Sequence, residues 1–278
     1  MSEIKNGITM LGTGSPRPDL ERSGPAQVLH INGMPILIDC GEGTTAQLLK
    51  ANIPPENVNV LMFTHLHSDH FFGYGQFLLG GWGRGRRELT VVGPKGIKEF
   101  HETVINMFKD DIAYRVSLGR PENGVLDVNI IEFDEPGEVS VDIPAKVSID
   151  EMVHNVPTFG FRFEMDNNVI VFSGDTAPTP NIVNLAQGAD ILVQDGCLAK
   201  TGIYRNTTDP ELLKIWENLQ KEHCTPGQAG DIAQEAGVKK LVMTHFLPNV
   251  IPEEVKEEAE EQFDGESIVG EDLMEISV

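Results

Sequence analysis

The chain has 278 residues, of which 40% are hydrophobic and 23% charged, as is typical of a globular protein with an ample core. It has no run of 18 or more apolar residues and no basic-then-apolar start, which argues against a membrane span and a secretory signal. The net charge of −22 disfavours nucleic acid as a partner, and three sparse cysteines are typical of a reducing cytoplasm.

The predicted elements alternate between strands and helices along most of the chain. Helical spacing of apolar residues predicts helices at residues 42–52, 95–108, 180–188 and 225–237. Apolar runs and alternating stretches predict strands at residues 8–14, 26–31, 34–41, 58–63, 88–94, 125–133, 145–154, 159–165, 168–176, 189–196 and 238–246. Strands in runs with helices between some of them indicate a mixed α/β protein.

No Ser/Gly-rich linker and no break in composition divides the chain, so a single domain over residues 1–278 is predicted. Its end is unusually acidic, because residues 252–278 carry eleven acidic residues against Lys256 alone. We expect this segment to form an exposed helix and a strand with a solvated acidic face.

The stretch THLHSDH at residues 64–70 concentrates metal ligands at the end of a predicted strand. His65 and His67 are two positions apart, so on extended backbone they point the same way. Asp69 and His70 are adjacent, and at a loop entering a helix they can face a second position. Imidazole and carboxylate ligands suit zinc, with iron or manganese as alternatives.

Four ligands do not complete the shells of two metal ions, so the chain must supply others. His154, Asp175 and His245 each stand at the end of a predicted strand. Strand ends that run into abrupt loops are where an α/β sheet gathers its functional residues. These three residues are therefore the candidates for the missing ligands.

The pattern H-x-H-x-D-H followed by single His, Asp and His residues resembles the metallo-β-lactamase superfamily of binuclear metallohydrolases. Within it, the ribonuclease Z and arylsulfatase branch is the most similar. The motifs that carry this resemblance are LGTGSPRP, LIDCGEGT, THLHSDHFFG, HNVPTFGFRFE, VIVFSGDTAP and HCTPGQAGDIAQEAGVKKLVMTHFLP. It covers nearly the whole chain and implies a four-layer αββα sandwich with the metals at one edge.

The resemblance also implies roles for individual residues. His65, His67 and His154 would hold one zinc ion, and Asp69, His70 and His245 would hold the other. Asp175 would bridge the two ions, Asp69 would count among the catalytic residues, and Asp39 would support the site from outside. Between two such metals, the pKa of a shared water falls to near neutrality and hydroxide becomes available for attack.

Two departures from ribonuclease Z affect the expected substrate. In that family a long arm that grips tRNA lies between the third and fourth motifs, whereas here His154 and Asp175 are only 21 positions apart. A His-Glu-Ala-Thr motif is replaced by QDGC, in which Asp195 keeps the carboxylate, and a His-Ser-Thr motif appears as HCT with His223. By analogy, Asp195 and His223 would protonate the leaving group; the alternative is a structural hydrogen bond.

The segment GGWGRGRREL follows the metal motif and places Trp82 and Arg84 in a glycine-rich setting. Arginine matches sulfate or phosphate oxygens, and tryptophan offers a face to an aryl group, so both residues are candidates for substrate binding. The alternative is a mobile surface loop or a contact between two subunits.

From the sequence we therefore expect a cytoplasmic binuclear metal hydrolase of small sulfate or phosphate esters, similar to arylsulfatases and phosphodiesterases. The alternatives are a ribonuclease Z-type tRNA 3′-end endonuclease, a lactonase and a non-catalytic metal-binding scaffold. The expected partner is a small-molecule anionic ester. Nucleic acid is disfavoured, no membrane is expected, and a homodimer is left open.

Overall fold

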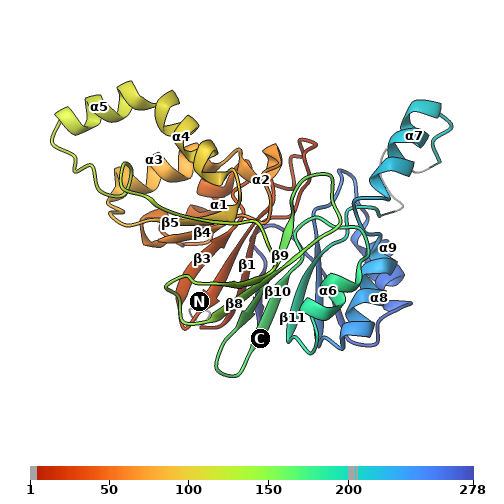
Figure 1. The fold of residues 1–278 in the computed structure, drawn as a ribbon. Coiled ribbons are helices and arrows are strands. Elements are labelled where there is room, and N and C mark those ends of the chain that lie inside the picture. Colours follow the sequence, from red (N-terminus) through yellow and green to blue (C-terminus); the bar gives the residue numbers. More distant parts are fainter. Residues whose placement is uncertain (1–4, 200–203, 205) are drawn as a thin grey trace.

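The structure is a computed structural model that describes residues 5–199, 204 and 206–278. Within these residues two seven-stranded sheets lie face to face (Figure 1). The first sheet has the spatial order β14 (Glu275–Ser277), β1 (Gly7–Gly12), β2 (Ala26–Ile31), β3 (Met34–Ile38), β4 (Val60–Met62), β5 (Thr90–Pro94) and β6 (Asn129–Phe133). The second has the order β13 (Glu266–Val269), β12 (Lys240–Thr244), β11 (Ile191–Asp195), β10 (Val169–Phe172), β9 (Phe159–Glu164), β8 (Lys146–Glu151) and β7 (Gly137–Val139).

Helices cover the outer face of each sheet (Figure 1). The first sheet is covered by α1 (Thr44–Lys50), α3 (Tyr74–Arg84) and α4 (Ile97–Met107), together with the short η1 (Pro55–Asn57). α5 (Lys109–Ser117) lies at the far end of this layer and adds Ile112 to its core. The second is covered by α6 (Pro180–Leu185), α8 (Pro226–Ala236) and α9 (Pro252–Glu260). The short α2 (Ser68–Phe71) lies at one edge of the sandwich, and α7 (Pro210–Leu219) projects from it. The expected αββα sandwich is confirmed.

The layers are held together by one apolar core between the sheets and one beneath each group of helices. Successive residues of a strand point to opposite faces. In β4, Leu61 therefore packs against the helices while Met62 packs between the sheets. In β11, Leu192 likewise packs against the helices while Val193 packs between the sheets. Burial on both faces explains why these strands are continuously apolar in the sequence.

The parallel strands of both sheets direct their carboxyl ends to one edge of the sandwich. β3 to β6 are parallel to one another, as are β10 to β13. Asp39 directly follows β3, His245 directly follows β12, and Asp195 is the last residue of β11. The edge where parallel strands end is the usual place of a binding site in α/β proteins.

The residues between His154 and Asp175 form β9 and β10, an antiparallel pair. As expected from the 21-residue spacing, no arm is inserted in this part of the chain. The arm with which ribonuclease Z grips tRNA therefore has no counterpart at this position.

The glycine-rich segment begins inside α3, which ends at Arg84, and continues through residues 85–89 outside any helix or strand. Trp82 and Arg84 therefore lie on a helix and not in the mobile loop given as an alternative. Tyr74, Phe77, Leu78 and Trp82 are buried at helical spacing on the face of α3 that packs against the first sheet. Gly81 lies on the same face, where an added Cβ would come within 2.5 Å of the Arg86 guanidinium. Here glycine permits close packing inside a helix rather than flexibility.

The acidic C-terminal segment contributes a strand to each sheet. β13 pairs with β12 in the second sheet, and β14 pairs with β1 in the first. Between them, the carboxylate of Asp272 accepts hydrogen bonds from the backbone N–H groups of Thr13 and Ser23. The single domain over residues 1–278 stays a prediction. None of the described helices combines the length and apolarity needed to cross a bilayer.

Candidate metal centre

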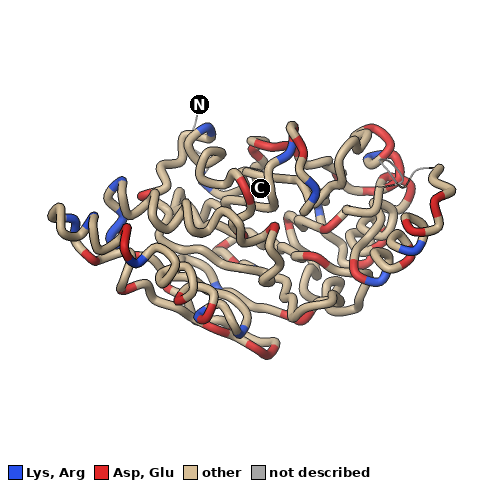
Figure 2. Tube along the Cα trace, turned by 90° about the horizontal axis from the view of Figure 1, so that it is seen from above, with Lys and Arg blue, Asp and Glu red and all other residues tan. Residues whose placement is uncertain are grey.

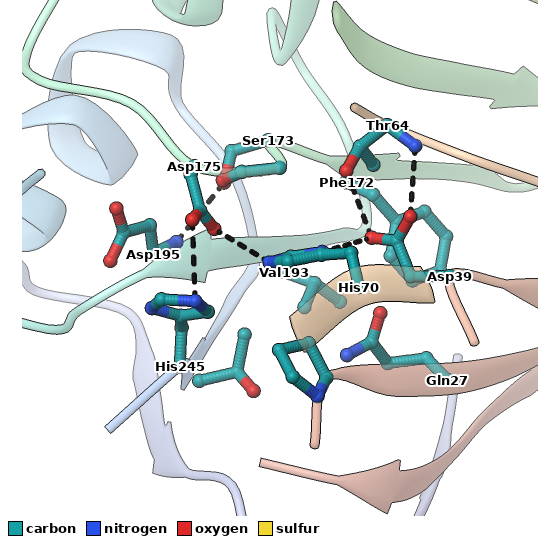
Figure 3. A pocket seen from close by; sticks show the side chains of 13 residues that line it. Gln27, Asp39, Thr64, His70, Phe172, Ser173, Asp175, Val193, Asp195 and His245 are labelled. Carbon is teal, nitrogen blue, oxygen red and sulfur yellow. Dashed lines mark hydrogen bonds and ion pairs between the residues drawn. The ribbon is translucent and has the colours of Figure 1, made fainter. Parts of the chain in front are cut away.

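The metal motif begins at Thr64, two residues after β4 ends, and Asp39 fixes it in place. The Asp39 carboxylate accepts hydrogen bonds from the backbone N–H of Thr64 (2.9 Å) and from its hydroxyl (2.9 Å). The same carboxylate lies 2.9 Å from Nδ1 of His70. Asp39, directly after β3, therefore ties the start of the metal motif to His70 in α2 (Figure 3).

The structure brings His65, His67, His154 and Asp175 together as one group of donor atoms. Nδ1 of His67 lies 3.1 Å from Nε2 of His154. Oδ2 of Asp175 lies 3.7 Å from Nε2 of His65 and 3.9 Å from Nε2 of His154. Residues from three separate segments thus surround one point.

Asp69, His70 and His245 form a second group beside the first. Nε2 of His245 lies 3.2 Å from the carboxylate of Asp69 and 3.2 Å from that of Asp175. Nε2 of His70 lies 3.4 Å from Oδ1 of Asp175. Figure 3 shows Asp175 between His70 and His245 of this second group. Because the same carboxylate also lies within 4 Å of His65 and His154, it faces both groups.

At three of the histidines, His65, His70 and His154, a hydrogen bond at Nδ1 leaves the Nε2 lone pair for a metal. The Thr64 hydroxyl donates to Asp39, so it accepts from Nδ1 of His65 at 3.0 Å. Nδ1 of His70 donates to Asp39, and Nδ1 of His154 donates to the carbonyl of Glu222 at 3.1 Å. With the proton on Nδ1, the Nε2 lone pair points into the site.

Two of these Nε2 atoms, those of His65 and His70, are buried without a hydrogen-bond partner. A buried polar atom without a partner costs about 1–3 kcal/mol. Two ligands about 2.0–2.1 Å from one tetrahedral zinc ion lie about 3.3 Å apart. The separations between donor atoms, 3.1 to 3.9 Å, lie close to that value. The donor set therefore fits two metal ions, with Asp175 shared.

The charges of the site favour a cation. Burial alone would lower the pKa of His70, but the carboxylates of Asp175, Asp39 and Asp69 raise it well above its ordinary value. By contrast, burial and the neighbouring His70 lower the pKa of His65 well below its usual range. The carboxylates thus stabilise positive charge among otherwise neutral imidazoles.

Three residues of the site have left-handed backbone conformations. Asp39 has φ of 56° and His245 has φ of 66°, which is uncommon for residues other than glycine. Gly174, before Asp175, has φ of 63°, and a Cβ there would come within 2.9 Å of Thr64. Such backbone persists where the surrounding structure over-determines it, and it clusters at functional sites.

Asp195 and His223 form a buried pair next to the metal ligands. Oδ2 of Asp195 lies 2.7 Å from Nδ1 of His223, and the His223 ring stacks on His245 with centroids 5.4 Å apart. The backbone N–H groups of Thr176 and Cys197 donate to the Asp195 carboxylate. Burial would lower the pKa of His223, but Asp195 raises it to about 9.

A small cavity with both polar and apolar walls lies among these side chains (Figure 3). Its volume is about 20 Å³, enough for one water molecule. The titratable residues that line it are Asp39, His70, Asp175, Asp195 and His245.

The structure contradicts the substrate-binding role expected for Trp82. Its side chain is fully buried, and its indole N–H donates to the carbonyl of Pro121 at 2.8 Å. No ring face is left for an aryl group. Arg84 is exposed at the end of α3, where it pairs with Glu56 rather than with the metal ligands.

Sequence reasoning also missed two groups that orient the ligands. The Thr64 hydroxyl sets the tautomer of His65, and its place directly before the histidines could have indicated this. The Glu222 carbonyl sets the tautomer of His154. A backbone carbonyl has no signature in the sequence, because every residue carries one.

A family model described as a beta-lactamase superfamily domain matches residues 35–246. The chain therefore belongs to the metallo-β-lactamase superfamily and is a metallo-hydrolase. Among named relatives, ribonuclease Z of Mycobacterium marinum (strain ATCC BAA-535 / M) is 31% identical, with 98% of each chain covered.

Solved structures agree with this assignment. The short form of human tRNase Z superposes with a TM-score of 0.72 and 25% identity, covering 98% of each chain. A metallo-beta-lactamase fold protein of Bacillus subtilis has a TM-score of 0.75 at 18% identity, covering 96% of this chain and 97% of its own. The second similarity concerns the fold alone.

These relatives contradict the expected partners. The net charge and the missing arm predicted a small-molecule ester as the substrate and disfavoured nucleic acid. The relatives, by contrast, are ribonucleases by name. The net charge misled because it averages over the chain. Residues 84–120 carry eight Lys and Arg against five Asp and Glu. Figure 2 shows several of these basic residues at the α5 end of the molecule.

Proposed function

We propose that the protein is a metal-dependent endonuclease of the ribonuclease Z type, which cuts the phosphodiester backbone of precursor tRNA at its 3′ end. One combination carries the proposal. A chain similar to ribonuclease Z over 98% of its length also brings seven metal donors and an Asp–His pair to one edge of its fold. The same similarity favours phosphodiesters over the sulfate esters expected from the sequence.

The first ion would be held by His65, His67 and His154, and the second by Asp69, His70 and His245. Asp175 would contribute to both, because its carboxylate faces both groups. Two bound ions would supply Lewis acidity to the phosphate oxygens and lower the pKa of water that attacks phosphorus. Imidazole and carboxylate donors in this number favour zinc.

The protein's own groups complete the reaction at the leaving oxygen. Asp195 accepts the Nδ1 proton of His223, so the transferable proton of the imidazolium is on Nε2. The stacking of His223 on His245 keeps this proton beside the metal ligands. His223 donates it to the leaving ribose oxygen, which is a poor leaving group unless protonated.

We also place this activity in the cytoplasm. Cys40, Cys197 and Cys224 are buried and free, as expected in a reducing compartment.

The proposal is tested with a precursor tRNA that carries a 3′ trailer and the zinc-loaded protein. We expect a single cut that releases the trailer, and no cut by the Asp175→Asn variant. A lactonase or a non-catalytic metal-binding protein would leave the precursor intact. An intact precursor alongside full metal loading would overturn the proposed function.

A further inference from the structure

α7 carries apolar side chains that lie outside the three cores formed by the residues that the structure describes. None of these side chains is buried. They are Leu212, Leu213, Ile215, Trp216 and Leu219. The Asp209 side chain caps the start of the helix by accepting from the N–H of Glu211. An isolated helix of this length has only marginal stability in water. The cap at Asp209 alone therefore does not explain why α7 stays helical with these apolar side chains unburied.

On this helix, Trp216 is part of a row of flat side chains from three segments. The rings of Trp216 and Tyr204 lie 5.2 Å apart between centroids, at an interplanar angle of 39°. The Arg17 guanidinium lies over the Tyr204 ring, with Cζ 5.7 Å from the ring centroid. Both aromatic rings are half-buried, and Arg17 is exposed. Arg17 makes no ion pair among the described parts of the chain.

Both ends of this row are anchored in segments that also build the metal centre. α7 ends at Leu219, whose carbonyl accepts from the N–H of His223, and the carbonyl of the neighbouring Glu222 accepts from Nδ1 of His154. Trp216 precedes His223 by seven residues, on the order of 10 Å at the helical rise. On the other side, Gly14 pairs as an isolated bridge with Phe246, which directly follows His245, and Arg17 is three residues further along.

We propose that Arg17, Tyr204 and Trp216 form a stacking surface for unpaired nucleotides of the RNA substrate beside the cleaved phosphodiester. Aromatic faces stack on any base, and arginine adds a positive charge for the backbone or stacks in turn. This combination suits single-stranded RNA, since each base of a duplex is already stacked on its neighbours. The inference rests on the proposed function, because it gives the RNA-cleaving site a binding surface for the trailer.

A binding experiment tests this surface without cleavage. Trp216 and the fully buried Trp82 are the two tryptophans of the chain, so a stacked base quenches mainly Trp216. The probes are a hexa-adenylate and the same sugar–phosphate chain without bases. We expect the hexa-adenylate to quench the fluorescence and to bind about tenfold more tightly than the abasic chain. Equal affinity of the two probes would overturn the proposal.

Variants test the same surface during cleavage. Because α7 buries none of its side chains, Trp216→Ala should fold normally. We expect it to raise KM about tenfold for a precursor tRNA with a five-adenylate trailer, at an unchanged kcat, and Trp216→Phe to restore most of the loss. Leu49→Ala shortens an exposed apolar side chain on α1, outside the basic segment of residues 84–120, and serves as the control, with no expected change.

The outcomes separate this inference from the proposed function. Quenching by the hexa-adenylate without any cleavage of precursor tRNA would support the surface and overturn the proposed function. Cleavage of precursor tRNA with an unchanged KM in Trp216→Ala would support the proposed function and overturn the stacking surface. A change in oligomeric state in Trp216→Ala, without a change in RNA affinity, would assign the apolar side chains of α7 to a protein contact and overturn the stacking surface.

Discussion

Nδ1 of His223 lies 2.7 Å from Oδ2 of Asp195, although 28 residues separate the two along the chain. Asp195 ends β11, while His223 follows α7, so the pair joins the second sheet to the projecting helix. The resemblance to ribonuclease Z pointed to this pair, and the structure adds its burial and its stacking on His245.

The first prediction concerns His223 as the acid for the leaving group. His223→Ala should lower kcat for precursor tRNA by roughly 10²–10⁴-fold, because the leaving ribose oxygen needs a proton. Hydrolysis of bis(4-nitrophenyl) phosphate should fall far less, because nitrophenolate leaves without one. Steady-state kinetics on both substrates, at equal metal content, measures the difference. An equal fall in kcat on both substrates would contradict the acid role of His223 and assign the Asp195–His223 pair a structural role.

The second prediction concerns Asp39, which touches no substrate but orients His70 and Thr64. Asp39→Ala should weaken metal binding about 10- to 100-fold, as is typical when a residue that orients a ligand is removed. Competition with a chromogenic chelator measures the affinity. Asp166→Ala, in the exposed turn between β9 and β10, is the matched control. Identical affinities in the two variants would contradict the role of Asp39.

The third prediction concerns Trp82, which fills the core under α3. Trp82→Ala should lower the free energy of unfolding by about 3–5 kcal/mol, because a large cavity replaces the indole. Trp82→Phe should cost less and leave KM unchanged. Urea unfolding and steady-state kinetics measure the two effects. A higher KM with unchanged stability would restore the substrate-binding role that the structure contradicts.

The fourth prediction concerns Asp272, whose carboxylate ties the C-terminal segment to the loop after β1. It accepts hydrogen bonds from Thr13 and Ser23, and from Nε2 of Gln47 at 2.8 Å. Asp272→Ala should therefore lower the free energy of unfolding by about 3 kcal/mol, since several buried donors lose their acceptor. The neighbouring Glu271→Ala, at an exposed position, should change it by less than about 0.5 kcal/mol. Thermal unfolding compares the two variants, and equal values would contradict the structural role.

Strands and ligands were the predictable part of the molecule. β4 and β11 are apolar on both faces, which gives a strong local signal, and the ligands follow strand ends. The prediction for α3 is wrong because a cluster of glycines was taken to indicate a mobile segment, whereas Gly81 permits close packing inside the helix. The buried Tyr74, Phe77 and Trp82 at helical spacing carried the better signal.

Other features depend on tertiary contacts and could not be read from the sequence. The Glu222 carbonyl orients His154 only because the end of α7 folds back onto the site. The partner was misjudged for a related reason. A net charge is a sum over the chain, whereas RNA would meet only the charges near the site.

The central claim is that seven side chains from distant segments hold two metal ions. Elemental analysis of the protein purified from zinc-supplemented medium tests it most directly. We predict about two zinc ions per chain in the unaltered protein and at most about one in Asp175→Asn, because that carboxylate lies close to His65 and His154 of the first group and to His245 of the second. One ion or none in the correctly folded, unaltered protein would contradict the two-metal account.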